Sequence, residues 1–310
     1  MKGLIAPTDF DWFRKLSSIK NLDEVNFWQP AGHRPLKSLS PGDPFFFKLK
    51  KPHDAIGGFG TFVRTCASPA LFAWDAFGEK NGVGSYEELL NRCITYRKKL
   101  KMAPLEPGQD PEIGCVMIVQ PVFFKESEWI PQPRDWKPNT ITPTYYDLTK
   151  GEGERIWEEC LRRGVAFQDL ESESARFGTP RLVEPRLGQG SFRISVIDAY
   201  GAACSITEEH SLPALEAAHI RPYSAGGPHS VRNGLLFRAD VHKLFDAGYV
   251  TVTPDAVFHV SPRLRKDWSN GRSYYPLDGK KMTMPRIKAD CPDLELLKWH
   301  NDHVFKPTGS

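Results

Sequence analysis

The sequence lacks the features that mark several common classes of protein. Its six cysteines form no C-x-x-C pair, which argues against a zinc ribbon or a thioredoxin-like redox site. No stretch approaches the ~18 consecutive apolar residues of a membrane span, and residues 1–13 lack the apolar core of a secretory signal. These absences predict a cytoplasmic protein without a membrane partner, whose cysteines are reduced and fill the core.

Excess charge is also scarce. The formal net charge is only +3, from 41 Lys and Arg against 38 Asp and Glu. A chain of this kind binds a polyanion only if its basic residues gather on one face. The length of 310 residues favours two domains. With 26 prolines and 25 glycines, many turns and strand-rich architecture are expected rather than a helical bundle.

Residues 1–148 are expected to form a strand-rich domain. Short apolar runs over 44–49, 55–63 and 114–124 have the length and composition of strands. The second run is rich in glycine, which favours a bend or a close approach to a ligand. Ser85 begins a capping-box pattern that leads into a helix over 89–99.

Residues 149–188 are interpreted as a helical linker. Four apolar residues between positions 156 and 161 share one face of a helix over 150–164. The following stretch, 165–188, is charged and contains two prolines, which favours a connection rather than a packed element. A C-terminal domain is then expected over 189–310.

The C-terminal third contains residues that suit phosphodiester hydrolysis. That reaction needs a base to activate water, a cation to stabilise the developing charge, and groups that orient both. His219 ends a short apolar strand, which exposes its imidazole at the strand end, and Asn233 lies in a turn where it can position a loop. His242 and Asp246 are one turn apart on a predicted helix, so they project from the same side. They suit two ligands on one divalent ion, Mg²⁺, Mn²⁺ or Ni²⁺, with Zn²⁺ as a further option.

The order of these residues along a strand–loop–strand–helix pattern resembles the HNH, or ββα-metal, nuclease module. The resemblance implies that His219 is the general base, that Asn233 orders the loop around it and that His242 binds the metal. Asp246 stands where some members carry a second helical ligand. The interval between Asn233 and His242 is the usual one, and the wider run over 186–250 resembles the bacterial restriction-type branch.

One position departs from the family pattern. Many HNH nucleases place a His or Asp metal ligand immediately before the general base, where this chain has Ala218. The metal would then have only the two helical ligands, with phosphate and water completing its shell. Glu216 and Asp240 are alternative ligands, but strand alternation puts Glu216 on the face opposite His219.

Basic residues around the motif are candidates for contacts with the phosphate backbone, although a solvated charged rim would have the same composition. These candidates are Arg221, Arg232, Arg238 and Lys243. Farther along, residues 263–275 interleave basic and aromatic side chains. This pattern is typical of a DNA-facing strand and loop, or of a simple hairpin with a mixed surface.

A nuclease module alone has little specificity for its target, so the N-terminal domain is expected to supply that specificity. The Phe27-Trp28 pair, the turn over 40–43 and the Phe45–Phe47 strand before a glycine-rich strand resemble the PUA-like group, which includes EVE, ASCH and SRA-type domains. That resemblance implies a β-barrel that recognises a modified base. Most aromatics here are core; the candidates for stacking on or reading an extruded base are Trp28, Phe47, Trp74 and Asp75, the last two in a predicted loop.

Together these features predict an α+β protein with a PUA-like β-barrel over 1–148, a helical linker over 149–188 and an HNH nuclease domain over 189–310. The leading hypothesis is a divalent-metal-dependent endonuclease of bacterial defence that cuts double-stranded DNA carrying modified cytosine. A homodimer is expected, because double-strand cleavage by a single-site module commonly needs two copies. The alternatives are a non-cleaving protein that binds modified nucleic acid through a silent HNH fold, which Ala218 favours, and an RNA-directed enzyme.

Overall fold

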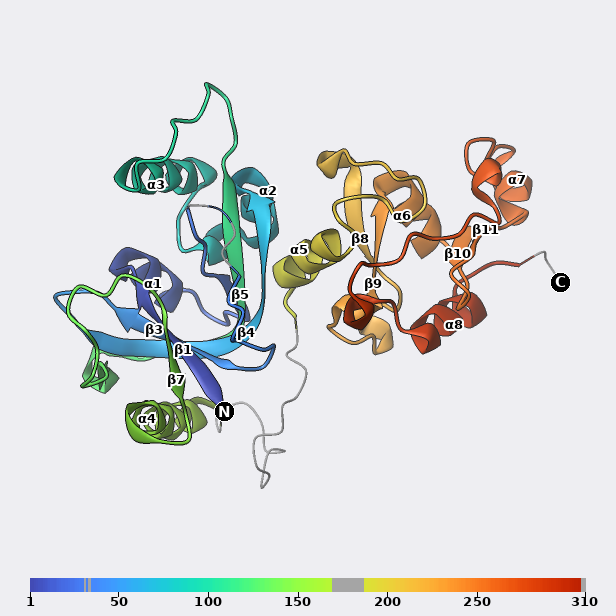
Figure 1. Ribbon diagram of the computed structural model, residues 1–310. Coiled ribbons are helices and arrows are strands. Elements are labelled where there is room, and N and C mark those ends of the chain that lie inside the picture. The colour runs from blue at the N-terminus through green and yellow to red at the C-terminus, as the bar shows by residue number, and fades with distance from the viewer. Residues whose placement is uncertain (31, 33–34, 169–186, 308–310) are drawn as a thin grey trace. The chain divides into compact units, whose positions relative to one another are not determined.

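The computed structural model describes residues 1–30, 32, 35–168 and 187–307 (Figure 1). The chain divides into two compact units, Met1–Ser191 and Phe192–Ser310. Helices and strands occur in both, which confirms the predicted α+β class. Part of the expected linker, residues 169–186, lies outside the described residues. Its other residues, 149–168 and 187–188, belong to the N-terminal unit.

A mixed sheet forms the centre of the N-terminal unit (Figure 1). The strand order is β2-β5-β4-β3-β1-β7, and the short β6 pairs with β4. Only β1 and β3 run parallel; the other neighbours are antiparallel. The strands are β1 (Lys2–Thr8), β2 (Glu24–Asn26), β3 (Pro44–Leu49), β4 (Ala55–Pro69), β5 (Glu112–Phe123), β6 (Ile130–Pro131) and β7 (Thr144–Asp147).

The predicted barrel is not closed in the part of the chain that the structure describes, where the end strands β2 and β7 do not pair with each other. Both are short, three and four residues long, so they offer little backbone for a closing ladder. The long strand β4 curves through register shifts at Phe59/Thr61 and Phe62/Arg64, as bulges in a ladder do. The sheet is therefore curved but open.

The glycines of β4 serve strand packing. A Cβ at Gly58 would lie 2.1 Å from the backbone oxygen of Val122 on β5. No side chain fits at that distance, so the close approach predicted from the glycine-rich run is to a neighbouring strand.

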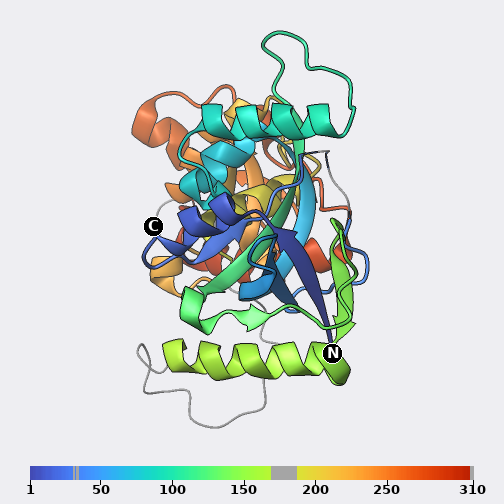
Figure 2. The same ribbon diagram turned by 90° about the vertical axis from the view of Figure 1, so that its left-hand side faces the viewer.

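Alternation along β1 and β3 divides the core of this unit between the two faces of the sheet. One face carries Leu4 and Phe45, which pack against the helix α1 (Phe10–Ser17). The other carries Ile5 and Phe46, which pack against the helix α4 (Gly151–Gln168). Ile156 and Cys160 of α4 are fully buried there, so this part of the expected linker helix belongs to the core. Figure 2 shows α4 on one side of the sheet and α3 on the other.

Two further helices follow β4. The helix α2 (Ala70–Phe77) and the 3-10 turn η1 (Gly78–Asn81) occupy the stretch that was expected to be a loop. The helix α3 (Tyr86–Lys99) begins where the capping pattern predicted, since the Ser85 hydroxyl accepts from the Glu88 backbone N–H. Among the described residues, no helix is long and apolar enough to cross a membrane.

The C-terminal unit contains two small hairpins with helices around them (Figure 1). The first pairs β8 (Leu215–His219) with β9 (Gly234–Arg238), and the helix α6 (Ala239–Asp246) follows. The second pairs β10 (Val250–Val252) with β11 (Phe258–Val260). The remaining helices are α5 (Gln189–Ala199), α7 (Arg263–Trp268) and α8 (Leu294–His303). The run that was read as a strand or hairpin over 263–275 thus begins as a helix.

Candidate active site

The first hairpin places His219 at the end of a strand, as its position in the sequence predicted. His219 is paired in register with Gly234, the first residue of β9. The ring of Phe192 on α5 stacks on the His219 imidazole, with 3.8 Å between centroids and 8° between planes. A Cβ at Gly234 would lie 2.4 Å from a methyl group of Val196, so the glycine lets α5 approach the hairpin closely enough for this stack.

The surroundings of His219 keep its imidazole neutral. Burial, followed by the positive charges that His229 and His242 can carry, lowers the pKa of His219 from 6.5 to about 4. Within the described ranges, no residue forms a hydrogen bond with the ring. At neutral pH the imidazole therefore has a lone pair that is open to water or a ligand, which is what a general base requires.

The side chain of Asn233 forms hydrogen bonds with both ends of the loop that joins the hairpin strands. Its side-chain oxygen accepts from the Arg221 backbone N–H at 2.9 Å. Its amide nitrogen donates to the carbonyls of Arg221 at 2.9 Å and Pro228 at 3.0 Å. A Cβ at Gly227 would lie 1.9 Å from the Arg221 carbonyl oxygen, so the loop closes tightly here. Buried Asn233 thereby fixes the backbone that follows His219.

His242 and Asp246 meet on one side of α6, as their spacing predicted. The His242 Nε2 lies 3.3 Å from the Asp246 Oδ2. On the other edge of the ring, Nδ1 lies 2.7 Å from Oε2 of Glu216 on β8. Burial raises the pKa of Asp246; His242 opposes that shift and Glu216 adds to it. A bound cation would favour the ionised carboxylate again.

The donors at this point suit a divalent ion that retains other ligands. An imidazole and a carboxylate come from the chain, and Ala218 is fully buried and offers no third donor. Among the residues the structure describes, no three His, Cys, Asp or Glu side chains converge as a metal cluster. Hard ions such as Mg²⁺ are commonly held by one or two carboxylates together with water and phosphate oxygens. The residues fit such an ion bound jointly with substrate.

The two substitute ligands considered from the sequence have different surroundings. Asp240 forms a two-point pair with Arg238, each N–O distance being 2.7 Å, and also accepts from the Tyr274 hydroxyl. These contacts lower its pKa to about 2, chiefly through the hydrogen bond from Arg238. Glu216, which alternation placed on the face opposite His219, instead contacts His242. Its Oε2 lies 2.7 Å from Nδ1 of that ring.

Three of the four basic candidates for phosphate contact are engaged within the unit. The Arg221 side chain donates to the Ala225 carbonyl, the Arg232 side chain forms an ion pair with Asp293 at 3.1 Å, and that of Arg238 pairs with Asp240. Lys243 is exposed on α6. Of the four, Lys243 is the side chain most available to a phosphate.

Of the four candidate base-contacting residues, Trp28 lines a pocket that the other three do not line. Phe47 is fully buried and stacks on Phe123 at 5.3 Å. Trp74 and Asp75 lie on α2, not in the predicted loop. Trp28 lines a pocket of about 280 Å³ within the N-terminal unit. Phe47 is a core residue because it faces α1 from β3 and packs against Trp12.

The Trp28 pocket has two aromatic walls. The Trp28 indole N–H donates to the Asn81 carbonyl at 2.9 Å, which fixes the ring. The ring centroids of Tyr96 on α3 and Trp28 are 6.2 Å apart, and the angle between the ring planes is 75°. The exposed side chains of Leu100 and Ile141 also line the pocket, and they give it apolar sides.

A carboxylate lies in the same pocket. Asp9 accepts from the Tyr96 hydroxyl at 3.1 Å, and its oxygens lie 3.7 Å from Arg92 and 3.9 Å from Lys50. Burial and then Asp9 raise the pKa of Tyr96 to about 12, so the phenol keeps its proton and donates. Apolar walls with a few polar groups are typical of small-molecule sites. Tyr96 and Asp9 were not singled out from the sequence, because no local motif marks them.

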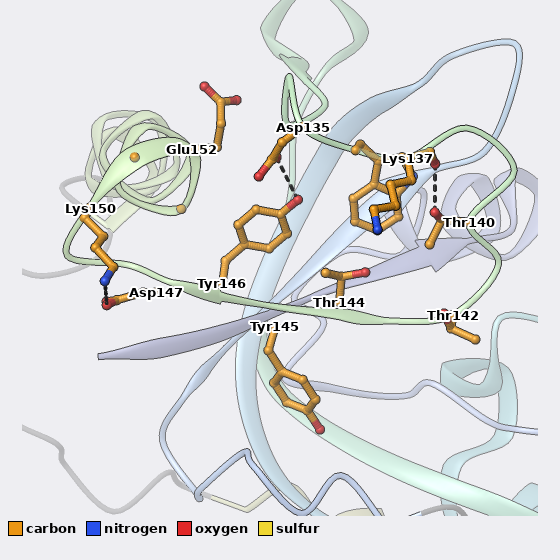
Figure 3. A pocket seen from close by; sticks show the side chains of 13 residues that line it. Asp135, Lys137, Thr140, Thr142, Thr144, Tyr145, Tyr146, Asp147, Lys150 and Glu152 are labelled. Atoms are coloured by element: carbon orange, nitrogen blue, oxygen red, sulfur yellow. Dashed lines mark hydrogen bonds and ion pairs between the residues drawn. The ribbon is translucent and has the colours of Figure 1, made fainter.

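A larger hollow, of about 650 Å³, lies beside the edge strand β7 (Figure 3). Here the Tyr146 hydroxyl donates to Asp135 at 2.9 Å, and Lys150 lies 3.6 Å from Asp147. Figure 3 shows Tyr145 projecting from the side of β7 opposite to Tyr146. The polar groups of this hollow pair with one another, whereas the Trp28 pocket offers aromatic faces to a ligand.

Comparison with known proteins assigns the C-terminal region. Residues 204–253 match the family described as HNH endonuclease, a span that includes the histidine, asparagine and aspartate residues of the candidate site. The chain thus carries an HNH endonuclease domain, which supports its assignment as a nuclease.

Solved structures similar to this chain include the ASCH protein from Zymomonas mobilis, at 10% identity and a TM-score of 0.31, covering 50% of this chain and 94% of that one. Its Y47F mutant is similar at 10% identity and a TM-score of 0.32, covering 51% and 98%. The modification-dependent TagI restriction endonuclease is similar at 14% identity and a TM-score of 0.28, covering 91% and 75%. No curated protein matches the chain.

Proposed function

We propose that this nuclease is a divalent-metal-dependent endonuclease that cuts double-stranded DNA containing modified cytosine, as a modification-dependent restriction enzyme. The observation that carries the proposal is the neutral, stacked imidazole of His219, with an open lone pair, close to the His242–Asp246 pair in an HNH domain. The metal, the DNA substrate and the modification are all parts of this proposal.

Each side chain of the site has a role that its geometry supports. His219 takes a proton from the attacking water, since its imidazole is neutral at physiological pH. Asn233 holds the loop on which His219 ends, and exposed Lys243 contacts a phosphate. His242 and Asp246 would hold the divalent ion, which stabilises charge on the phosphorane and the leaving oxygen when bound.

The test of the nuclease proposal is cleavage of paired plasmids, unmodified and cytosine-modified, with Mg²⁺, Mn²⁺, Ni²⁺ or EDTA. We expect metal-dependent cutting of the modified plasmid and none with EDTA. Equal cutting of both plasmids would retain the nuclease and remove the dependence on modification. Absence of cutting with every metal would contradict the proposal and favour the silent binding protein.

The Trp28 pocket supports recognition of a base extruded from the duplex. Its volume of about 280 Å³ lies just below the usual range for ligand pockets, which begins at roughly 300 Å³, so it suits a ligand as small as a single base. The aromatic faces of Trp28 and Tyr96 offer stacking surfaces. The Asp9 carboxylate can accept from the exocyclic amino group of cytosine, and Ile141 lies at the apolar side, where a 5-substituent would be tolerated.

The pocket is tested by the affinity of the protein for short duplexes in EDTA, where no cleavage occurs. Trp28→Ala should weaken binding to a 5-methylcytosine duplex by about 1–3 kcal/mol, the value of one base–aromatic stack. The matched control is Trp74→Ala, because Trp74 lies on α2 and does not line the pocket. Equal losses in the two variants would contradict the assignment.

One observation favours the alternative of a non-cleaving binding protein: buried Ala218 stands where a third metal ligand is expected. Measured Mn²⁺ binding by the wild-type protein would remove that alternative. Competition between duplex DNA and RNA would decide the RNA-directed alternative. The homodimer is tested by the mass of the protein–DNA complex in sedimentation; the cytoplasmic location stays a prediction.

A further inference from the structure

Glu216 has no role in the function proposed above, although it forms a direct contact with the candidate metal site. Its Oε2 lies 2.7 Å from Nδ1 of His242, and the two residues are 26 positions apart in the chain. We propose that Glu216 is a positioning residue, which holds the His242 ring so that Nε2 is presented to the divalent ion beside Asp246. This inference rests on the proposed metal-dependent function.

The two edges of the His242 ring have different partners, and this decides how Glu216 can act. Nδ1 faces Glu216, whereas Nε2 faces Oδ2 of Asp246 at 3.3 Å. An ionised carboxylate only accepts hydrogen bonds, so the contact with Glu216 places the imidazole proton on Nδ1. The contact of Nε2 with Asp246 is longer, at 3.3 Å, so the single proton of a neutral ring lies on Nδ1 and Nε2 keeps the lone pair that a metal needs. Glu216 therefore acts through His242 and not as a ligand in its own right.

The position of Glu216 also accounts for how the site works without a ligand at position 218. Residues 216 and 218 lie on the same face of β8 by strand alternation. Ala218 is fully buried and carries no donor. Two residues earlier on that face, Glu216 reaches across to α6 and holds His242. Partners of this kind, which fix the orientation and raise the basicity of a metal-binding histidine, accompany most metal sites.

The arrangement explains why these three side chains form no convergent metal cluster. Glu216 and Asp246 lie on opposite edges of the His242 ring. An ion at Nε2 would lie at the edge of the ring that faces Asp246, whereas Glu216 contacts the other edge through Nδ1. The chain thus supplies two ligands and one orienting carboxylate.

The first test measures the tautomer of His242 in metal-free, full-length protein with ¹⁵N-labelled histidine, by long-range ¹H–¹⁵N correlation. His242→Ala identifies the resonances. We expect the Nδ1–H tautomer in the wild type, and a shift toward the Nε2–H tautomer in Glu216→Met, which has a similar length and no acceptor. The Nε2–H tautomer in the wild-type protein would overturn the proposal.

The second test measures Mn²⁺ affinity by electron paramagnetic resonance. Glu216→Met should bind Mn²⁺ about 10–100-fold more weakly than the wild type, the usual effect of losing such a partner. Glu216→Gln should show a smaller loss, because its amide oxygen still accepts from Nδ1. The control is Asp240→Asn, which removes a carboxylate from α6 that pairs with Arg238 and not with His242. It should leave Mn²⁺ affinity unchanged.

The outcomes separate the two proposals. If the wild type binds Mn²⁺ and Glu216→Met binds it equally well, the role of Glu216 is wrong and the metal site stands. If the wild type binds no Mn²⁺, the proposed metal-dependent function fails, and the tautomer measurement still decides whether Glu216 orients His242. If Glu216→Met does not fold, the wild-type tautomer and Glu216→Gln provide the same decision.

Discussion

Two histidines of the C-terminal unit have almost the same aromatic environment, but they differ in whether their ring nitrogens form hydrogen bonds. His219 stacks on Phe192 at 3.8 Å and 8°, and His300 stacks on Phe245 at 3.7 Å and 6°. Burial lowers the pKa of each to about 4. A stacked ring and a lowered pKa therefore do not by themselves mark a catalytic histidine.

The difference lies in the ring nitrogens. His300 Nε2 donates to the Phe245 carbonyl at 3.1 Å, and its Nδ1 accepts from the Thr251 hydroxyl at 2.8 Å. Both nitrogens are satisfied, and only 2% of the residue is exposed. The ring of His219 has no such partner in the described part of the chain. His300 is accordingly a structural residue, and His219 has a lone pair available for chemistry.

The largest effect that would test this contrast is on catalysis at His219. His219→Ala should lower the rate of cleavage by about 10²–10⁴-fold, the usual contribution of a general base. The melting temperature should fall as well, because the stack on Phe192 is lost, so the rate is measured well below that temperature. The measurement is the initial rate on modified plasmid. A matched control is His259→Ala on β11, a half-exposed histidine that pairs with Asp278; a similar loss there would remove the special role of His219.

His300→Ala should show the opposite effect. It deletes a buried ring that packs on Phe245 and leaves the Thr251 hydroxyl without its partner, so the free energy of unfolding should fall by about 2–4 kcal/mol. Urea unfolding measures this. Residual folded protein should bind metal normally, because neither metal-binding side chain contacts His300. A change in stability below about 0.5 kcal/mol would contradict the structural role.

The pH dependence of the two histidines sharpens the contrast further. Each pKa is lowered in the folded protein, so the unfolded chain takes up protons first as the pH falls below its ordinary value of 6.5. The free energy of unfolding therefore falls progressively as the pH decreases from 6.5 to about 4. Below about pH 4 both histidines are protonated in the folded protein too, so they cause no further loss of stability. Urea titrations of His300→Ala should show a shallower loss over this range.

For His219 the same shift affects the rate. Because the folded imidazole stays neutral down to about pH 4, protonation of the base should not limit cleavage between pH 5 and 7. Phe192→Leu removes the stacked ring and part of the burial, so it should raise the pKa of His219 toward 6.5 and move the acid limb of the rate profile to higher pH. An acid limb that does not move would show that Phe192 does not set this pKa.

The smallest expected effect comes from a single hydrogen bond to His300. Thr251→Val keeps the shape of a fully buried side chain and removes the hydroxyl that donates to Nδ1. Stability should fall by about 1 kcal/mol, the usual net value of such a bond. Thermal unfolding measures it, with cleavage of modified plasmid as the control, which should be unchanged. A larger loss of activity than of stability would place His300 in the catalytic machinery.

Much of the nuclease region could be predicted because its signal is local. The strand that ends at His219, the turn at Asn233 and the one-turn spacing of His242 and Asp246 are all patterns within about 30 residues. Strand and helix periodicities encode which of these side chains share a side. The confirmed α+β class and the HNH region follow from these patterns.

Other features could not be read in this way, because they depend on contacts between distant elements. Trp28 and Tyr96 form the walls of one pocket only after α3 packs beside the sheet. The sheet is open instead of closed because its end strands are short, which single-strand patterns do not reveal. Phe47 is a core residue because it faces α1, and composition alone does not separate core aromatics from exposed ones.

The sequence by itself thus determined the order and spacing of His219, Asn233, His242 and Asp246, since each rests on the periodicity of one short element. Only the tertiary structure decided that Glu216 contacts His242, that most nearby arginines are already paired and that His219 and His300 differ in their hydrogen bonds. The physical reason is that the partner of a polar side chain depends on strand register and helix packing, and these are set by the whole core rather than by neighbours in the sequence.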